Sequence, residues 1–159
     1  MIRVQRADLS QPQQASDWLQ LMNEYAQHPM GGAQPLSPQV CESLPRLLSE
    51  RAGAFQFLAY VEQRPVGVLN AFEGFSTFKA RPLMNIHDVI VTADHRGSGV
   101  AAALFDAVTE LARQRDCCKL TLEVLQGNLA AQKAYRKLGF EAYQLDPAMG
   151  QALFWGKPL

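Results

Sequence analysis

The chain has 159 residues, and 15 lysine and arginine residues balance 15 aspartate and glutamate residues, so the formal net charge is zero. This length fits a single domain spanning residues 1–159, and the balanced charge gives no reason to expect a nucleic acid or a membrane surface as a partner. No apolar run approaches the ~20 residues that span a bilayer, and the N-terminal segment does not resemble a signal peptide. Because the three cysteines lack a metal-ligand spacing, we expect reduced thiols, no bound metal and a cytoplasmic protein.

The first half of the chain predicts one strand, two helices and then a run of strands. Ile2–Arg6 alternates apolar and polar residues, which is typical of a short strand, and Pro12–Gln27 has the apolar spacing of an amphipathic helix. Ser37 followed by Pro38 is typical of the start of a second helix, and we expect this short helix to form one wall of a substrate cleft. Three strands are expected next, at 55–61, 66–72 and 83–91. A hairpin joins the first two strands, and a loop over Gly74–Pro82 precedes the third.

The second half alternates strands and helices. Apolar residues at helical spacing predict a helix from Ser98 to near Arg115, and a strand is expected over Lys119–Val124. Asn128 is typical of the N-cap of a further helix, which we expect to end before Gly139. Two final strands are expected at 140–145 and 151–156, and the whole pattern predicts an α+β fold.

The stretch Arg96–Ala101 is the first candidate site. Gly97 and Gly99 let the backbone approach a ligand, and the N–H groups in the first turn of the following helix have no partner within that helix. With the helix dipole and the charge of Arg96, these donors predict an anion site, most naturally for phosphate. Two other interpretations are a plain strand-to-helix turn and the dinucleotide fingerprint of an NAD(P)-dependent reductase. The reductase fits poorly, because too few residues follow the turn to build most of a parallel sheet.

The second candidate site lies on the helix that begins after Asn128. Asn128, Ala131 and Tyr135 follow the i, i+3, i+7 spacing and therefore share one helix face. A tyrosine outside the apolar stripe can be a packed core ring or a hydroxyl group that points into a cleft. The spacing alone leaves both interpretations open.

Both candidate sites resemble motifs of the GNAT acetyltransferases. Arg96-x-x-Gly99-x-Ala101 resembles the Gln/Arg-x-x-Gly-x-Gly/Ala signature of that family, and Asn128-x-x-Ala131-x-x-x-Tyr135-x-x-x-Gly139–Phe140 is similar to its second acetyl-CoA motif. The resemblance covers essentially the whole chain. It implies an α/β fold whose mixed central sheet of six to seven strands is splayed in the middle and flanked by about four helices. Residues 74–78 and 85–88 also resemble the spermidine/spermine acetyltransferase-like branch, which usually has Glu–Asp where this chain has His87–Asp88.

The resemblance implies an N-acetyltransferase that moves an acetyl group from acetyl-CoA to a primary amine of a small molecule or peptide, by direct attack in a ternary complex. It implies that the central strand offers main-chain groups to the pantetheine arm and that the glycine turn wraps the pyrophosphate. The cofactor-binding residues it implies are Val89, Ile90, Val91, Arg96, Gly97, Ser98, Gly99, Val100, Ala101, Asn128, Ala131 and Tyr135. With the apolar segment 152–155, it also implies a homodimer.

Three residues are candidates for moving protons: His87, Asp88 and Tyr135. An alkylamine with a pKa of about 10.4 must lose a proton before it attacks, which costs about 4.6 kcal/mol at pH 7. The imidazole of His87 can accept this proton, whereas Asp88 is expected on the opposite face of the strand, where it would fix a loop or bind the charge of the amine. By the resemblance, Tyr135 would protonate the departing sulfur. A non-catalytic acyl-CoA-binding sensor, with the turn but without an acid and a base, is the alternative.

Overall fold

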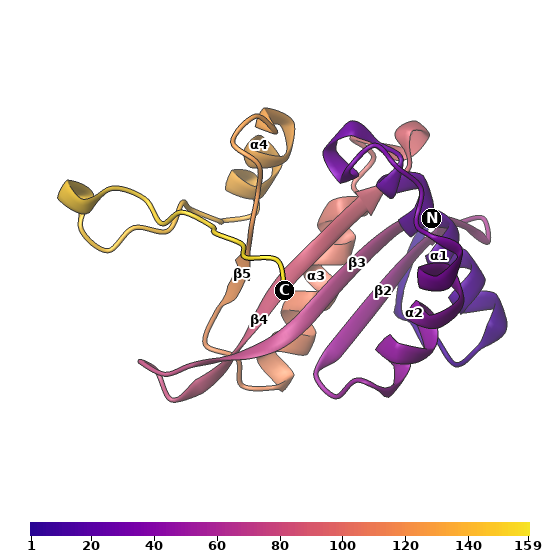
Figure 1. Cartoon of the computed structure of the whole chain (residues 1–159), viewed down its shortest axis with the longest axis horizontal. Helices are drawn as coiled ribbons and strands as arrows, with labels where there is room; N and C mark the ends of the chain where they lie inside the picture. The colour runs from indigo at the N-terminus through magenta and orange to yellow at the C-terminus, as the bar shows by residue number, and fades with distance from the viewer. The chain divides into compact units, whose positions relative to one another are not determined.

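A five-stranded sheet organises the first 122 residues of the chain (Figure 1). The computed structural model describes residues 1–159 and divides into two compact units, Met1–Leu122 and Glu123–Leu159, which are described separately. The strand order is β1-β2-β3-β4-β5, with antiparallel neighbours from β1 to β4 and a parallel β4–β5 pair. The strands are β1 (Ile2–Arg6), β2 (Ala54–Val61), β3 (Arg64–Ser76), β4 (Arg81–Val91) and β5 (Leu120–Leu122).

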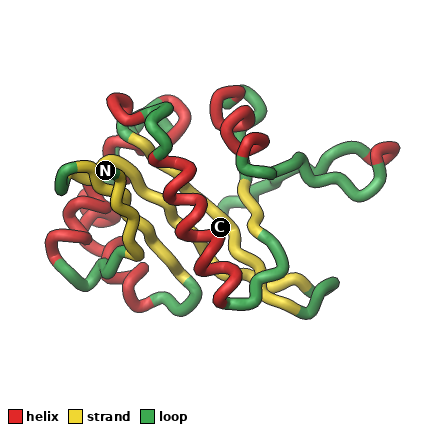
Figure 2. The backbone as a smooth tube through the Cα atoms, turned by 180° about the vertical axis from the view of Figure 1, so that it is seen from behind, coloured by secondary structure: helices red, strands yellow, loops and turns green.

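Three helices cover the two faces of this sheet. Helices α1 (Pro12–Ala26) and α2 (Pro38–Glu50) lie in front of the sheet in Figure 1, and α3 (Val100–Gln114) crosses its other face, as Figure 2 shows from behind. None of the helices combines the length and the apolar character that a membrane crossing requires. The core on the α1 side is built from buried residues of α1, of the sheet and of the turn between β1 and α1: Leu9, Trp18, Leu21, Leu58, Tyr60, Val68 and Ile90.

On the other face, Gly67 sets how closely α3 approaches the sheet. A Cβ atom at this position of β3 would lie 2.8 Å from Val100 Cγ1 and 3.1 Å from Leu104 Cδ1. Only a residue without a side chain leaves room for these two α3 residues, both of which are buried. Gly67 therefore fixes the first turns of α3 against the sheet, next to the end of β4.

The long hairpin between β3 and β4 corrects the loop expected over Gly74–Pro82. The two strands pair as far as Ser76 and Arg81, so only residues 77–80 form the connection. A glycine and a proline normally indicate a loop, but a long partner strand supplies a ladder that local preference does not reveal. Pro82 still takes part in the sheet, where it pairs with Phe75 of β3, and its carbonyl accepts the N–H of Cys118 at 2.8 Å.

The unit Glu123–Leu159 contains one α-helix, α4 (Leu129–Lys137), and no strand. The strands expected at 140–145 and 151–156 are therefore wrong in this structure, and the sheet has five strands rather than six to seven. A single backbone hydrogen bond, from Ala152 to the Tyr143 carbonyl, joins the two segments. Apolar alternation yields a strand only where a neighbour supplies a ladder of such bonds. A single domain over the whole chain stays a prediction.

Candidate functional site

The turn after β4 has the backbone of an anion site. Gly97 and Gly99 have φ of +76° and +93°, a region that side chains other than glycine rarely adopt. Gly99 is the N-cap of α3, and the first bond of the helix runs from Ala103 N–H to the Gly99 carbonyl. The N–H groups of residues 100–102 therefore precede the hydrogen-bonded part of the helix and are available to a ligand.

Space and charge at this turn fit the same interpretation. A Cβ atom at Gly97 would meet nothing within 4 Å, and one at Gly99 would meet only Ile2 Cδ1, at 3.8 Å. The Ser98 hydroxyl donates to the His95 carbonyl at 2.6 Å and so keeps the turn closed. Arg96 Nε donates to the Val91 carbonyl at 3.4 Å, which holds a permanent positive charge beside the open backbone.

The strand that leads into this turn has a free main-chain edge. Pairing between β4 and β5 stops at Ile86 and Leu122, although β4 continues to Val91. The Thr92 N–H donates to the Val66 carbonyl at 2.9 Å, so this residue faces β3. Because alternate residues of a strand direct their main-chain groups to the same side, Ile90 also faces β3. Val89 and Val91 then direct their N–H and C=O groups away from β3. Another extended chain could pair with Val89 and with the Val91 N–H, whereas the Val91 carbonyl already accepts Arg96 Nε.

A β-bulge at His87 changes the expected direction of the neighbouring side chain. Asn70 pairs with Asp88, but Ala71 pairs with Ile86, so β4 contains one residue more than β3 at this point. The Asp88 carboxylate accepts a hydrogen bond from Asn70 Nδ2 at 2.9 Å, and the His87 ring lies 4.6 Å from the ring centroid of Phe72. Asn70 and Phe72 are two residues apart on β3 and therefore share a face. The expectation that His87 and Asp88 lie on opposite faces is wrong, because the bulge turns both toward α1 and α2.

A buried polar network holds Asp88. Asn70, which is 2% exposed, donates to Asp88 and accepts a hydrogen bond from Trp18 Nε1 at 2.8 Å. Tyr25 of α1 also interacts with Asp88. Burial raises the pKa of the Tyr25 hydroxyl group, and the negative charge of Asp88 raises it further. Sequence reasoning missed Trp18, Asn70 and Tyr25 as parts of the site, because the pairing of distant strands brings them to Asp88.

His87 lies at the wall of an open groove of about 540 Å³. The groove is lined by Leu47 and Leu48 of α2, by Arg51 directly after it, and by Phe72 and His87 of the sheet. Helix α2 thus forms one wall of a groove, in agreement with the expectation for this short helix. Rise along a strand is about 3.3 Å per residue, so the groove begins about 13 Å along β4 from the end that enters the glycine turn.

The second motif is formed as predicted within the unit Glu123–Leu159. Asn128 Oδ1 accepts the N–H of Ala131 at 3.1 Å and caps α4. Tyr135 is half-buried, and its ring lies 6.1 Å from that of Phe140 in an edge-on arrangement. Gly139 ends the helix with φ of +88°. A role for Asn128, Ala131 and Tyr135 at a cofactor stays a prediction.

Comparisons with known proteins agree on one family. The family described as "Acetyltransferase (GNAT) family" matches residues 16–140. Streptothricin acetyltransferase of Streptomyces lavendulae is 35% identical over 85 residues, which cover 54% of this chain and 45% of that protein. Mycothiol acetyltransferase of Kocuria rhizophila is 31% identical over 159 residues, or 91% of this chain and 48% of that protein. This chain thus spans about half the length of these relatives.

The fold has close counterparts among solved structures. The crystal structure of a probable acetyltransferase superposes with a TM-score of 0.82 at 18% identity, covering 99% of this chain and 97% of that one. At this identity the likeness concerns the fold alone. The sheet, the three flanking helices and the turn described above therefore follow an architecture found in other proteins.

Proposed function

Because this chain belongs to the acetyltransferase (GNAT) family, we propose that it is an acetyl-CoA-dependent N-acetyltransferase acting on a primary amine of a small molecule or peptide. The observation that carries the proposal is the free edge of β4 that runs into the open glycine turn. The free edge of β4 suits the amide-containing pantetheine arm of acetyl-CoA, and the glycine turn suits its pyrophosphate. The proposed reaction is direct attack by the amine in a ternary complex.

The residues of the turn fit the cofactor. Acetyl-CoA would supply an acetyl group activated as a thioester. Val89 and Val91 would bind its pantetheine arm through main-chain groups. The open turn at Gly97 and Gly99, the N–H groups of residues 100–102 and the charge of Arg96 would bind its pyrophosphate. The side chain of Ile90 packs in the core on the α1 side of the sheet and supports β4 there. The open space at both glycines leaves room for a ligand at the backbone.

The environments of His87 and Asp88 favour different roles for them. Asp88 accepts a hydrogen bond from the buried Asn70, which suits a residue that positions its neighbours. His87 is exposed, lines the groove and is oriented by its ring contact with Phe72. We assign to His87 the acceptance of the amine proton, since an imidazole can take up a proton near neutral pH. Tyr135 is proposed as the group that protonates the departing sulfur.

The two alternatives differ in what they require. A Rossmann-type reductase needs a mostly parallel, doubly wound sheet, whereas β1 to β4 are antiparallel. A non-catalytic acyl-CoA sensor needs only the turn and no proton-transfer groups. Binding without acetyl transfer distinguishes the sensor from the enzyme. A homodimer and a cytoplasmic location stay predictions from the sequence.

The test combines cofactor binding with acetyl transfer. Gly99→Asp should abolish acetyl-CoA binding in calorimetry, because it places a side chain and a negative charge where the pyrophosphate would bind. Gly32→Asp is the matched control: Gly32 also has a positive φ, +111°, and open space around it, but lies in another turn. Both variants should show a similar loss of stability of about 1–2 kcal/mol from the strained backbone.

Acetyl transfer is then measured as free-thiol release with a panel of amines. We expect the parent protein to release free thiol with at least one amine. Gly99→Asp should lose this release, and Gly32→Asp should retain it. Unchanged acetyl-CoA affinity in Gly99→Asp would overturn the site. Tight binding without thiol release from any amine would favour the sensor.

A further inference from the structure

The groove beside His87 carries a charge pattern that selects among amines. Its lining contains apolar side chains, the imidazole of His87 and one permanent charge, the guanidinium of Arg51. No carboxylate lines it. The apolar part comes from Leu47, Leu48 and Phe72, and Leu47 is half exposed at the surface of α2.

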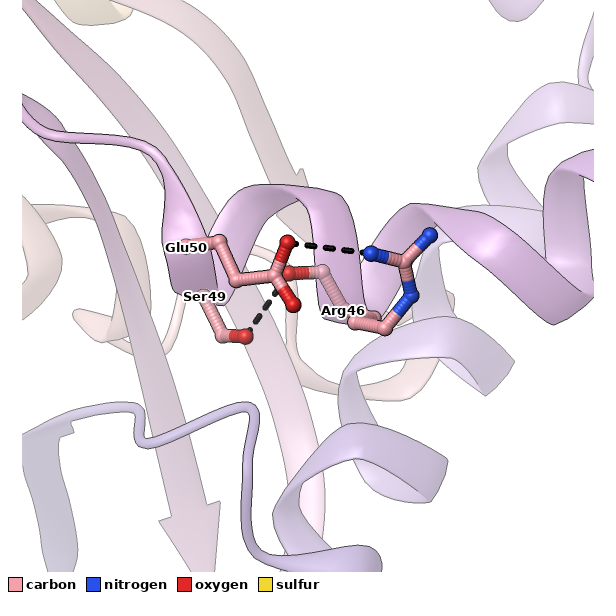
Figure 3. Close-up of polar contacts among 3 residues, drawn as sticks. All are labelled: Arg46, Ser49 and Glu50. Carbon is pink, nitrogen blue, oxygen red and sulfur yellow. Dashed lines mark hydrogen bonds and ion pairs between the residues drawn. The ribbon is translucent and has the colours of Figure 1, made fainter.

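Three carboxylates on the surrounding elements are engaged with groups of this chain, and the fourth, Glu42 of α2, does not line the groove. Glu50 of α2 forms an ion pair with Arg46 at 3.0 Å, and Figure 3 shows this pair along the helix. Glu73 of β3 forms an ion pair with Arg115, and Asp88 of β4 accepts a hydrogen bond from Asn70. A polyamine or another polycation would therefore find no free carboxylate in the groove and would meet the positive charge of Arg51.

Arg51 itself has no ion-pair partner in this chain. It is the C-cap of α2, and the negative end of the helix dipole favours a cation there. A guanidinium in this position is suited to a carboxylate, which it can bind through two parallel hydrogen bonds. The groove thus offers an anion site, an apolar wall and a proposed base within one small volume.

We propose that the acceptor is an α-amino acid with an apolar side chain, whose carboxylate binds Arg51 and whose amino group faces His87. This inference rests on the proposed acetyl transfer and adds the substrate class and its specificity residue. A small zwitterion of this kind brings an amine and an anion together, and its side chain can cover Leu47 and Phe72. The resemblance to the polyamine branch therefore does not extend to the substrate.

The experiment compares acceptors that differ only at the carboxylate. L-Leucine and L-leucinamide share the side chain and the α-amine, and spermidine represents the polycations. The parent should acetylate L-leucine with a KM at least about tenfold below that for L-leucinamide, from the loss of one charge-assisted contact. Arg51→Gln should raise the KM for L-leucine about tenfold to a hundredfold, while the KM for L-leucinamide and for acetyl-CoA stays unchanged. Arg51→Lys should restore part of the difference.

Arg113→Gln is the matched control, because it neutralises an exposed arginine of α3 that forms no ion pair in this chain and does not line the groove. It should leave every KM unchanged. Equal turnover of L-leucine and L-leucinamide, or transfer to spermidine without transfer to L-leucine, would overturn the substrate class and leave the acetyltransferase proposal standing. Absence of transfer to any amine would overturn both. Calorimetric binding of L-leucine to the parent, lost in Arg51→Gln, provides a readout independent of turnover.

Discussion

Replacing Asn70 with alanine is the sharpest test of the polar network under the site. Asn70 joins Trp18, which is fully buried, to Asp88, through hydrogen bonds of 2.8 and 2.9 Å. Asn70→Ala leaves the indole N–H of Trp18 without a partner in the core, at a cost of about 1–3 kcal/mol. Loss of the Asn70 amide that donates to Asp88 adds about 1–2 kcal/mol. This cost is smaller than that of losing a hydrogen bond to a fully buried charge, because Asp88 is half-buried and water can replace the amide. The total is about 2–5 kcal/mol.

For a chain of this length, each kcal/mol lowers the melting temperature by about 2–4 °C, so a fall of about 4–20 °C is expected. Thermal unfolding followed by circular dichroism measures it, and Trp18→Phe with the double variant completes a double-mutant cycle. The coupling between the two substitutions should be at least about 0.5 kcal/mol, since they remove the same hydrogen bond. A loss below about 1 kcal/mol for Asn70→Ala, or additive single effects, would refute the reasoning.

Three further predictions concern single side chains that can gain or lose a proton. Tyr135→Phe should lower kcat about 10²–10⁴-fold with little change in acetyl-CoA binding, and an unchanged kcat would remove Tyr135 from the mechanism. His87→Ala should reduce the rate most below pH 8, where the amine is protonated, and a loss of rate that does not depend on pH would remove His87 from the mechanism. Burial, with the hydrogen bond to Asp17 as the second cause, raises the pKa of Tyr60 to about 12. Because the folded pKa exceeds the unfolded value near 10, this contribution to stability is complete below pH 10 and is lost as the pH rises through 12. An ultraviolet titration of tyrosinate should show a tyrosine that titrates near pH 12 and is lost in Tyr60→Phe. An unchanged titration curve near pH 12 in Tyr60→Phe would contradict the structure.

The helices and their ends were predictable because their signals are local. Ser37 accepts the N–H of Val40, and Asn128 accepts that of Ala131, so both caps lie where the sequence places them. The positive φ of Gly97 and Gly99 likewise follows from a turn that only glycine enters without strain. The anion-site geometry of Arg96–Ala101 could therefore be predicted from six residues.

Strand ends and the substrate groove were less predictable, because they depend on distant partners. Gly74 and Pro82 indicated a loop, yet the two strands support each other past both residues. Residues 140–145 have the composition of a strand but no ladder in this structure. The sequence predicted α2 as one wall of a cleft, but no local pattern in it encodes that Phe72 of β3 and His87 of β4 line the same groove.

The bulge at His87 shows how one register shift changes the chemistry of a site. In a regular strand, His87 and Asp88 would lie on opposite faces, and only one of them could reach the groove. The extra residue in β4 turns the imidazole toward Phe72 and the carboxylate toward Asn70, on the same side of the sheet. Asp88 is thereby held by the core while His87 remains free at the groove wall. Pairing on the β5 side ends at Ile86, directly before the bulge. The same point in β4 therefore separates the paired part of the strand from the part that we propose binds the cofactor.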